Sequence, residues 1–293
     1  MRQWAIKVLG ASGDFDLLPT IGSKELVAWL PTFLQVKKIL YPEIAYPTYL
    51  VGAFIGHSEA TPVGIAATMW PTADLAWVNS PSNPTGRIHS EAELKAVIEY
   101  SRRSGAVIAS DECYINFPHD KGKSKPLSIL QVANGDNKNV LAVHSLSKRS
   151  NMAGYRAGLV VGDSQLISQI REFRKHAGMI TPLPVQRAMT VALSDEQHVH
   201  EQAVRYSARR NALRRALESA GFRIEWSEAG LYIWCTRDES DWDSVKWFSE
   251  IGILVTPGNF YGEKADSHIR IALTSPDDQI AEAGQRIRAA IKQ

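Results

Sequence analysis

The sequence has few cysteines, little net charge and no long apolar run, and each of these features excludes a class of protein. Its 2 cysteines, Cys113 and Cys235, are too few for a disulfide framework, and both lie in apolar segments that favour buried free thiols. The 33 basic and 31 acidic residues leave a formal net charge of +2, which favours neither nucleic acid nor an anionic membrane as partner.

No segment approaches the roughly 18 consecutive apolar residues of a membrane helix, and the first apolar run is too short for a secretion signal. Segment 209–215 is strongly basic, but it lies in a helical pattern and is interpreted as a solvated face. We therefore expect a cytoplasmic protein whose partners are small molecules, with no nucleic acid, membrane or metal partner.

Three short apolar runs end abruptly in polar residues, as strands buried on both faces do. They are segments 75–78, 106–109 and 140–143. A helix is expected between the first two at 90–100, where Ser90 supplies a cap, and the spacing of the runs is that of βαβ units. A fourth run, 157–162, follows too closely for a crossover helix and is expected to pair antiparallel.

The second part of the chain has a different pattern, which predicts a linking helix and a small α+β unit. The helix is expected from Pro184 to near Gly221, with strands at 230–234, 253–255 and 268–273 and a closing helix from Asp277 to Lys292. The fold class is thus α/β, with a mostly parallel sheet and flanking helices. We expect a large domain at 1–195, and a linking helix with a smaller C-terminal domain at 196–293.

Polar residues that directly follow the apolar runs should meet at one edge of the sheet, where open α/β sheets bind ligands. Asn83 follows the first run, Asp111 ends the second and Lys148 follows the third. Each has an ordinary alternative, since most lysines are solvated and an aspartate after a strand often caps a helix. Together, however, they favour a binding site.

From Pro19 nearly to the carboxyl end, the sequence resembles the fold-type I, class I and II aminotransferases. Four motifs occur in the order of that family: 83–86 (Asn-Pro-Thr-Gly), 111–114 (Asp-Glu-Cys-Tyr), 145–148 (Ser-Leu-Ser-Lys) followed by Arg156, and 268–273 around Arg270. Segments 144–158 and 22–26 are also similar to the succinyldiaminopimelate transaminases of actinobacteria, which serve lysine and cell-wall biosynthesis.

This resemblance implies pyridoxal 5'-phosphate as the cofactor and assigns the residues that act on its ring. Lys148 would form the covalent bond to the cofactor aldehyde, and Asp111 would pair with the ring nitrogen. Asn83 and Tyr114 would hydrogen-bond the phenolic oxygen, although Tyr114 could instead be a residue at the rim of the core. Tyr46 is our choice to stack on the ring, whereas Tyr49 is expected only to pack.

The resemblance also implies residues for the cofactor phosphate and for the substrate. The amides of Ser23 and Lys24 at a helix start, with Ser145 and Arg156, would bind the phosphate, although Gly22-Ser23 could be a simple helix cap. Arg270, with Asn83, would hold the substrate α-carboxylate. The residue that reads a distal carboxylate stays open among four basic residues: Arg149, Arg174, Lys175 and His176.

The implied function is a homodimeric transaminase that moves an amino group from glutamate to an oxo-acid, with N-succinyl-2-amino-6-oxopimelate as the expected acceptor. Two alternatives are a β-eliminating carbon–sulfur lyase with the same cofactor, and a truncated, non-catalytic cofactor-binding protein. The truncated form is an alternative because relatives carry several tens of residues before the segment that matches Pro19, whereas 18 residues precede Pro19 here. We therefore expect a mostly complete cofactor site and an incomplete substrate site.

Overall fold

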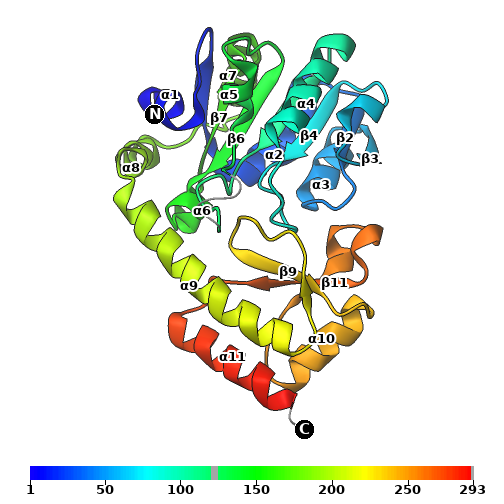
Figure 1. Ribbon diagram of the computed structural model, residues 1–293. Coiled ribbons are helices and arrows are strands. Elements are labelled where there is room, and N and C mark those ends of the chain that lie inside the picture. Colours follow the sequence, from blue (N-terminus) through cyan, green and yellow to red (C-terminus); the bar gives the residue numbers. More distant parts are fainter. Residues whose placement is uncertain (120–124, 292–293) are drawn as a thin grey trace.

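The computed structural model describes residues 1–119 and 125–291, which form two lobes, each built on its own sheet (Figure 1). The first lobe holds a mixed seven-stranded sheet. Across the sheet, its strands are β1 (Asp16–Ile21), β7 (Ala157–Gly162), β6 (Val140–Ser145), β5 (Val107–Asp111), β4 (Leu75–Asn79), β2 (Lys38–Pro42) and β3 (Glu59–Val63). All pairs are parallel except those of β7 with β6 and β1. The predicted parallel runs and the antiparallel fourth run are confirmed.

Helices cover both faces of this sheet, and every residue of β4, β5, β6 and β7 is therefore buried. One face packs against α1 (Arg2–Leu9), α4 (Glu91–Ser104), α5 (Ile129–Ala133) and α8 (Leu183–Ser194). The other packs against α2 (Gly22–Leu34), α3 (Thr48–Ile55) and α7 (Ser164–His176). The short α6 (Leu146–Arg149) follows β6, and the 3₁₀ turns are η1 (Ala67–Met69) and η2 (Ala153–Tyr155). These two apolar layers explain the near-continuous hydrophobic runs in the sequence.

The predicted crossover helix is confirmed as α4. Ser90 accepts a hydrogen bond from the amide of Glu93, while the Glu93 carboxylate accepts one from the amide of Ser90, so the helix starts with a capping box. The helix ends at Gly105, whose φ of 77° suits glycine.

The second lobe holds a four-stranded antiparallel sheet with helices packed on it. Its strands are β10 (Thr256–Pro257), β11 (His268–Ala272), β9 (Tyr232–Thr236) and β8 (Arg223–Ile224), and its other elements are α9 (Gln197–Ser219), α10 (Asp241–Glu250), α11 (Asp277–Ala290), η3 (Gly258–Tyr261) and η4 (Glu263–Ala265). The strand predicted at 253–255 is wrong. Leu254 is 94% exposed there, and pairing begins only at Thr256. The predicted end of the last helix, Lys292, lies outside the described residues.

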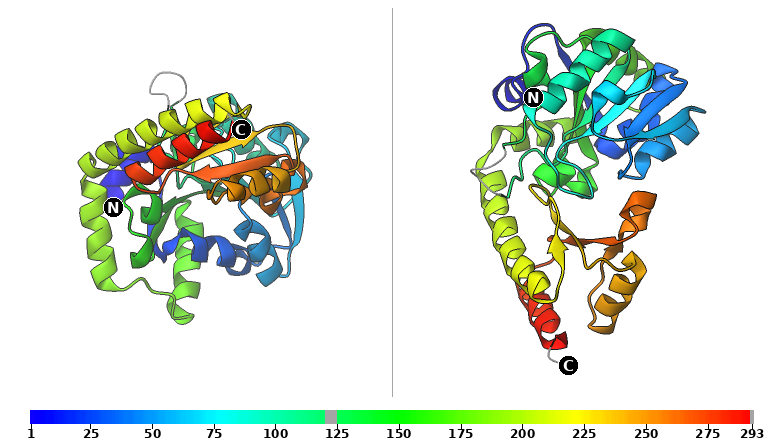
Figure 2. Two further views of the ribbon diagram at one scale, coloured as in Figure 1. Left: turned by 90° about the horizontal axis from the view of Figure 1, so that it is seen from below. Right: turned by 45° about the vertical axis from the view of Figure 1, so that its right-hand side comes forward.

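The single helix predicted from Pro184 to near Gly221 is also wrong, since the structure divides it into α8 and α9. Asp195 between them is extended, with φ −107° and ψ 113°, and its carboxylate accepts a hydrogen bond from the amide of Gln197 at 2.8 Å. This side-chain cap starts a new helix, so the chain changes direction (Figure 2). The predicted boundary between residues 195 and 196 falls in this break, and as a domain boundary it stays a prediction.

In the described part of the chain, no helix is both long enough and apolar enough to cross a membrane.

Candidate active site

The predicted site residues of the first lobe meet at one edge of its sheet. Because β7 alone runs in the opposite direction, the other six strands end at the edge where β7 begins. This edge faces the second lobe (Figure 1). The residues that follow or precede strands there are Ser23 and Lys24 after β1, Tyr46 after β2, Asn83 after β4, Asp111 and Tyr114 at β5, Ser145 and Lys148 at β6, and Arg156 before β7. Arg270 comes from β11 of the second lobe.

Lys148 is half-buried among charged and aromatic groups. Burial lowers the pKa of its ammonium, and the positive charges of Arg270 and Lys24 lower the pKa further, against the opposing effects of Cys113 and Asp111. Its Nζ atom lies 5.9 Å from the centroid of the Tyr114 ring. A lysine with a lowered pKa has a larger share of neutral amine, which is the form that attacks a carbonyl carbon.

Asp111 is only 6% exposed, and two neutral donors hold its carboxylate. Tyr49 Oη donates to Asp111 Oδ2 at 3.0 Å, and the amide of Cys113 donates to Oδ1 at 3.2 Å. Burial raises the pKa of Asp111, whereas these hydrogen bonds and the nearby His144 oppose the rise. A buried carboxylate of this kind gains most from a cationic hydrogen-bond donor, which a protonated pyridine nitrogen would provide.

Tyr49 was expected only to pack, and this expectation is incomplete. The ring does stack on Trp77, at 4.9 Å between centroids, but the hydroxyl is a hydrogen-bond partner of Asp111. The sequence offered one signal for this role, because Tyr49 lies three residues beyond the candidate stacking residue Tyr46. Tyr46 itself is half-buried and meets Tyr49 edge to face at 5.8 Å.

Arg270 joins the two lobes at the site. Its Nη1 donates to Asn83 Oδ1 at 2.9 Å, and its guanidinium lies over the rings of Tyr232 and Tyr261, 5.3 Å from each centroid. Its Nε is buried without a hydrogen-bond partner. The fork of this arginine therefore has unused donors for an acidic group.

Tyr114 is buried and meets the Tyr232 ring edge to face at 5.3 Å. Burial raises the pKa of its hydroxyl well above the usual range, so the phenol stays protonated and can donate a hydrogen bond at neutral pH.

The start of α2 has the features of an anion site. Its N-cap residue Ile21 makes no side-chain cap, and Gly22 adopts a φ of 72°, so the first amides are open to a ligand. A Cβ atom at Gly22 would lie 2.5 Å from Arg156 Nη2, and one at Gly158 would lie 2.6 Å from the amide nitrogen of Ser23. The glycines thus let the α2 amides and the Arg156 guanidinium approach each other. Ser145, 5% exposed, ends the neighbouring β6.

Two of the four basic residues left open for a distal carboxylate have structural partners instead. Arg149 is buried and donates to the carbonyl oxygens of Ala192 and Asp195 and to Glu196, and the buried Arg174 pairs with Glu25. Lys175 and His176 are exposed near Glu172. Among the described residues, no cluster of three or more His, Cys, Asp or Glu side chains is placed to hold a metal ion.

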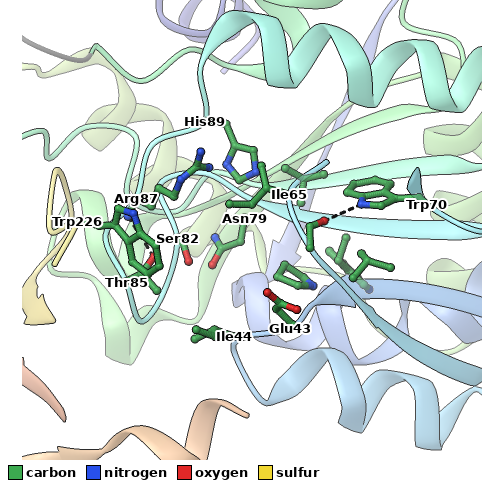
Figure 3. Close-up of a pocket in the computed structure, with 15 residues that line it drawn as sticks. Glu43, Ile44, Ile65, Trp70, Asn79, Ser82, Thr85, Arg87, His89 and Trp226 are labelled. Atoms are coloured by element: carbon green, nitrogen blue, oxygen red, sulfur yellow. Dashed lines mark hydrogen bonds between the residues drawn. The ribbon is translucent and has the colours of Figure 1, made fainter. Parts of the chain in front are cut away.

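A pocket beside this edge was not predicted from the sequence. It has a volume of about 90 Å³ and lies between the ends of β2 and β4 and the loop that carries Trp226 (Figure 3). Arg87 and His89, the first and third residues after the Asn-Pro-Thr-Gly motif, line it. Their position after that motif was the available signal.

Comparison with known proteins gives a match between residues 16–287 and the family model described as aminotransferase class I and II. The 4-dedimethylamino-4-oxo-anhydrotetracycline transaminase OxyQ of Streptomyces rimosus is 45% identical over 97% of this chain and 80% of its own length. A "probable aminotransferase" of Mycobacterium tuberculosis is 47% identical over 92% of this chain and 66% of its own length. An LL-diaminopimelate aminotransferase of Dehalococcoides mccartyi is 32% identical over 96% of this chain and 77% of its own length.

Solved structures of aminotransferases have the same fold. One from Staphylococcus aureus superimposes with a TM-score of 0.89 at 23% identity, covering 99% of this chain and 81% of its own. One from Neisseria meningitidis superimposes with a TM-score of 0.86 at 28% identity, covering 98% of this chain and 80% of its own.

Proposed function

The chain belongs to the class I and II aminotransferases, which are pyridoxal-phosphate-dependent enzymes, and from this premise we propose that it transfers an amino group from glutamate to an oxo-acid. The observation that carries the proposal is that Lys148, Asp111 and Arg270 meet at one sheet edge. The residues there fit the cofactor, because they offer an amine with a lowered pKa, a buried carboxylate and an open helix start beside an arginine. When bound, pyridoxal phosphate supplies the electron sink for charge that develops at the substrate α carbon.

Lys148 is proposed to have two tasks at its Nζ atom. It would hold the cofactor covalently, and once substrate displaces it, the freed amine would move a proton between the substrate α carbon and the adjacent cofactor carbon. The lowered pKa of Lys148 supports both tasks, since each requires a neutral amine at some point in the cycle.

Asp111, Tyr114 and Asn83 are proposed to set the charge of the ring. The buried Asp111 carboxylate would keep the ring nitrogen protonated, and Tyr49 holds that carboxylate in place. The protonated hydroxyl of Tyr114 and the amide of Asn83 would donate to the phenolic oxygen, which stabilises its anion. Tyr46 would cover one face of the ring, next to Tyr49.

The remaining contacts bind charged ends. We propose that the amides of Ser23 and Lys24, with Ser145 and Arg156, hold the cofactor phosphate at the start of α2. Arg270 would hold the α-carboxylate of the substrate bidentately, with its unpaired Nε facing a partner of opposite charge.

For the acceptor, we propose N-succinyl-2-amino-6-oxopimelate, in the diaminopimelate branch of lysine biosynthesis. The likeness of segments 144–158 and 22–26 to succinyldiaminopimelate transaminases supports the N-succinylated acceptor. The 32% identity to an LL-diaminopimelate aminotransferase supports the diaminopimelate branch alone. A second candidate is an acceptor whose oxo group lies on a ring, which the name of the 45% identical relative favours. A homodimer and a cytoplasmic location also remain proposals.

The test is to titrate the cofactor-loaded protein with glutamate while the absorbance of the cofactor is recorded. Transamination predicts a change in the cofactor band together with release of 2-oxoglutarate, and recovery of the band when the oxo-acid acceptor is added. Release of pyruvate from cystathionine without an acceptor would instead support β-elimination. A cofactor band that glutamate leaves unchanged would contradict the proposed amino donor.

A further inference from the structure

The unpredicted pocket lies where the winding of the sheet reverses. Strands β4, β5 and β6 are added successively toward one side, whereas β2 is followed by β3 on the other side. β2 and β4 pair only at Ile39 with Leu75 and at Leu40 with Ala76, so their carboxyl ends separate beyond that point. Open α/β sheets bind ligands at such a switch point. We call the cavity between these two ends the β2–β4 pocket.

Flat apolar side chains form much of the wall of the β2–β4 pocket. Trp70 and Trp226 lie at opposite ends of it, with Asn79 and Ser82 between them (Figure 3). Ile44, Ile65 and Trp77 contribute further apolar surface. The pocket can therefore hold a hydrocarbon chain.

Trp226 reaches the pocket from the second lobe on a strained loop. Trp226 and Ser227 have φ values of 46° and 50°, in the left-handed region that residues other than glycine rarely adopt. The amide of Ser227 donates to the carbonyl oxygen of Thr85 at 2.9 Å, and the amide of Glu228 donates to Gly86, which holds the loop on the first lobe. Strain that is fixed in this way, with an indole left 48% exposed beside a cavity, points to a ligand contact.

The polar atoms that remain unpaired in the pocket wall are atoms that can donate hydrogen bonds. Arg87 Nη1, His89 Nδ1 and Trp77 Nε1 are buried without a hydrogen-bond partner. Arg87 Nη2 donates to Glu93 at 2.6 Å, and the wall carboxylate of Glu43 pairs with Lys264 at 2.5 Å. Burial and the charge of Arg87 lower the pKa of His89 to about 4, so its ring is neutral at pH 7. A matching ligand would present acceptor oxygens, as a carboxylate or acyl carbonyl does.

The size of the pocket limits what can enter. About 90 Å³ is well below the roughly 300 Å³ or more of pockets that enclose a whole small ligand. A pocket of this volume suits a short arm of a ligand and not a whole ligand.

The β2–β4 pocket shares a wall with the site of Arg270. Asn79 and Ser82 line the pocket, and Asn79 Oδ1 accepts a hydrogen bond from the amide of Asn83 at 2.7 Å. The side chain of Asn83 in turn accepts from Arg270. Hydrogen bonds of this turn therefore link the pocket wall to the residue that accepts from Arg270.

We propose that the β2–β4 pocket binds the carboxylate-bearing acyl arm of the acceptor, with Arg87 and His89 as donors to its oxygens and Trp226 packed on its carbon chain. This inference rests on the proposed function and deepens it, since it makes the pocket the element that selects an N-succinylated substrate over an unacylated one.

The first test is calorimetric and requires no turnover. N-Succinylglycine and N-acetylglycine, which carry no reactive amine, are titrated into the cofactor-loaded protein. The wild type should bind the succinylated probe roughly 10-fold or more tightly than the acetylated one, because a charged hydrogen bond distinguishes them. Arg87→Met should remove this preference, and Arg103→Met, a change at an exposed residue of α4 outside the pocket, should retain it. Equal binding of both probes by the wild type would overturn the proposal.

The second test is kinetic. The rates of amino transfer from N-succinyl-LL-diaminopimelate and from glutamate are compared, and Arg87→Met should lower the ratio of their kcat/KM values roughly 10- to 100-fold. Trp226→Ala, which leaves the Arg87 pair with Glu93 intact, should lower the same ratio. An equal loss for both donors would assign Arg87 a structural role and overturn the proposal. A wild type that does not react with glutamate would contradict the proposed function. The calorimetric comparison of the two probes would still test the pocket, because it requires no turnover.

Discussion

At the residue scale, the Asp111 carboxylate shows how a binding site can oppose the stability of the protein that contains it. It is buried at the end of β5 with Tyr49 and Cys113 as donors, and burial is the largest influence on its pKa, which is raised. A carboxyl group whose pKa is higher in the folded protein than in the unfolded chain favours folding when it is protonated. This contribution is complete at pH values below the pKa in the unfolded chain, and it is lost as the pH rises through the pKa in the folded protein. Without cofactor, the ionised Asp111 carboxylate therefore lowers the free energy of unfolding at neutral pH.

Asp111→Asn should separate the effect of this carboxylate on stability from its effect on activity. We expect the cofactor-free variant to gain stability relative to the cofactor-free wild type as the pH rises from about 4, the unperturbed carboxyl range, to 7. We also expect transaminase activity to fall at least roughly 100-fold, since the neutral amide cannot keep the ring nitrogen protonated. Urea unfolding at both pH values and the glutamate assay measure the two effects. If the difference in free energy of unfolding between the variant and the wild type stays constant across this pH range, Asp111 does not have the raised pKa that its burial predicts.

The second residue-scale prediction concerns Lys148. Lys148→Ala should abolish the covalent attachment of the cofactor while retaining part of its noncovalent affinity, because the phosphate and ring contacts come from other residues. Borohydride reduction followed by mass spectrometry should give a covalent adduct in the wild type and none in the variant. Arg156→Ala is the matched comparison, expected to weaken cofactor binding while leaving the adduct chemistry intact. An adduct of unchanged amount in Lys148→Ala would move the assignment to another amine.

At the element scale, Arg149 holds the end of α8 at the break before α9. This arginine is 4% exposed and donates to the carbonyl oxygens of Ala192 and Asp195 at the end of α8, as well as to Glu196. Arg149→Met should destabilise the protein by about 2–3 kcal/mol, because it removes charged hydrogen bonds and leaves helix-end carbonyls without partners. Urea unfolding measures the change. Lys175→Met, at an exposed end of α7, is the control and should shift stability by less than about 0.5 kcal/mol.

The same elements show what the sequence can and cannot predict. The strands β4, β5 and β6 were predictable because a strand buried on both faces has a continuous apolar run, and their polar ends identified the sheet edge. The break at Asp195 was missed although the side-chain cap that starts α9 is local, and the contact of Arg149 with the carbonyl oxygen of Asp195 comes from a residue distant in sequence. The Tyr49 hydroxyl, likewise, reaches Asp111 only because the fold brings β5 and the start of α3 together.

The site followed the same rule. Residues in motifs next to strand ends could be placed from the sequence, because the topology of the sheet brings those ends together. Trp226 and its pocket could not, because the loop that carries it comes from the other lobe and is held there by backbone hydrogen bonds. Contacts between lobes leave no local pattern in either segment.

At the scale of the whole molecule, α8 and the segment just before it expose apolar side chains that we expect a partner to cover. Ile180, Leu183 and Val191 are 60%, 59% and 69% exposed, and only Met189 and Leu193 of α8 are buried. A contiguous patch of exposed apolar side chains marks protein–protein contacts, and we expect these three side chains to form one in the proposed homodimer.

Leu183→Asp should therefore convert a dimer into a monomer without unfolding it. Leu183 is the first residue of α8, where an added carboxylate stabilises the helix through its macrodipole, so the variant should keep its fold. Light scattering after size-exclusion chromatography should give twice the 32.4 kDa chain mass for the wild type and the single mass for the variant. Leu254→Asp, which places the same charge at a 94% exposed position of the second lobe, should remain dimeric. If the wild type is monomeric at micromolar concentration, or if Leu183→Asp remains dimeric, α8 is not the dimer interface and its apolar face needs another partner.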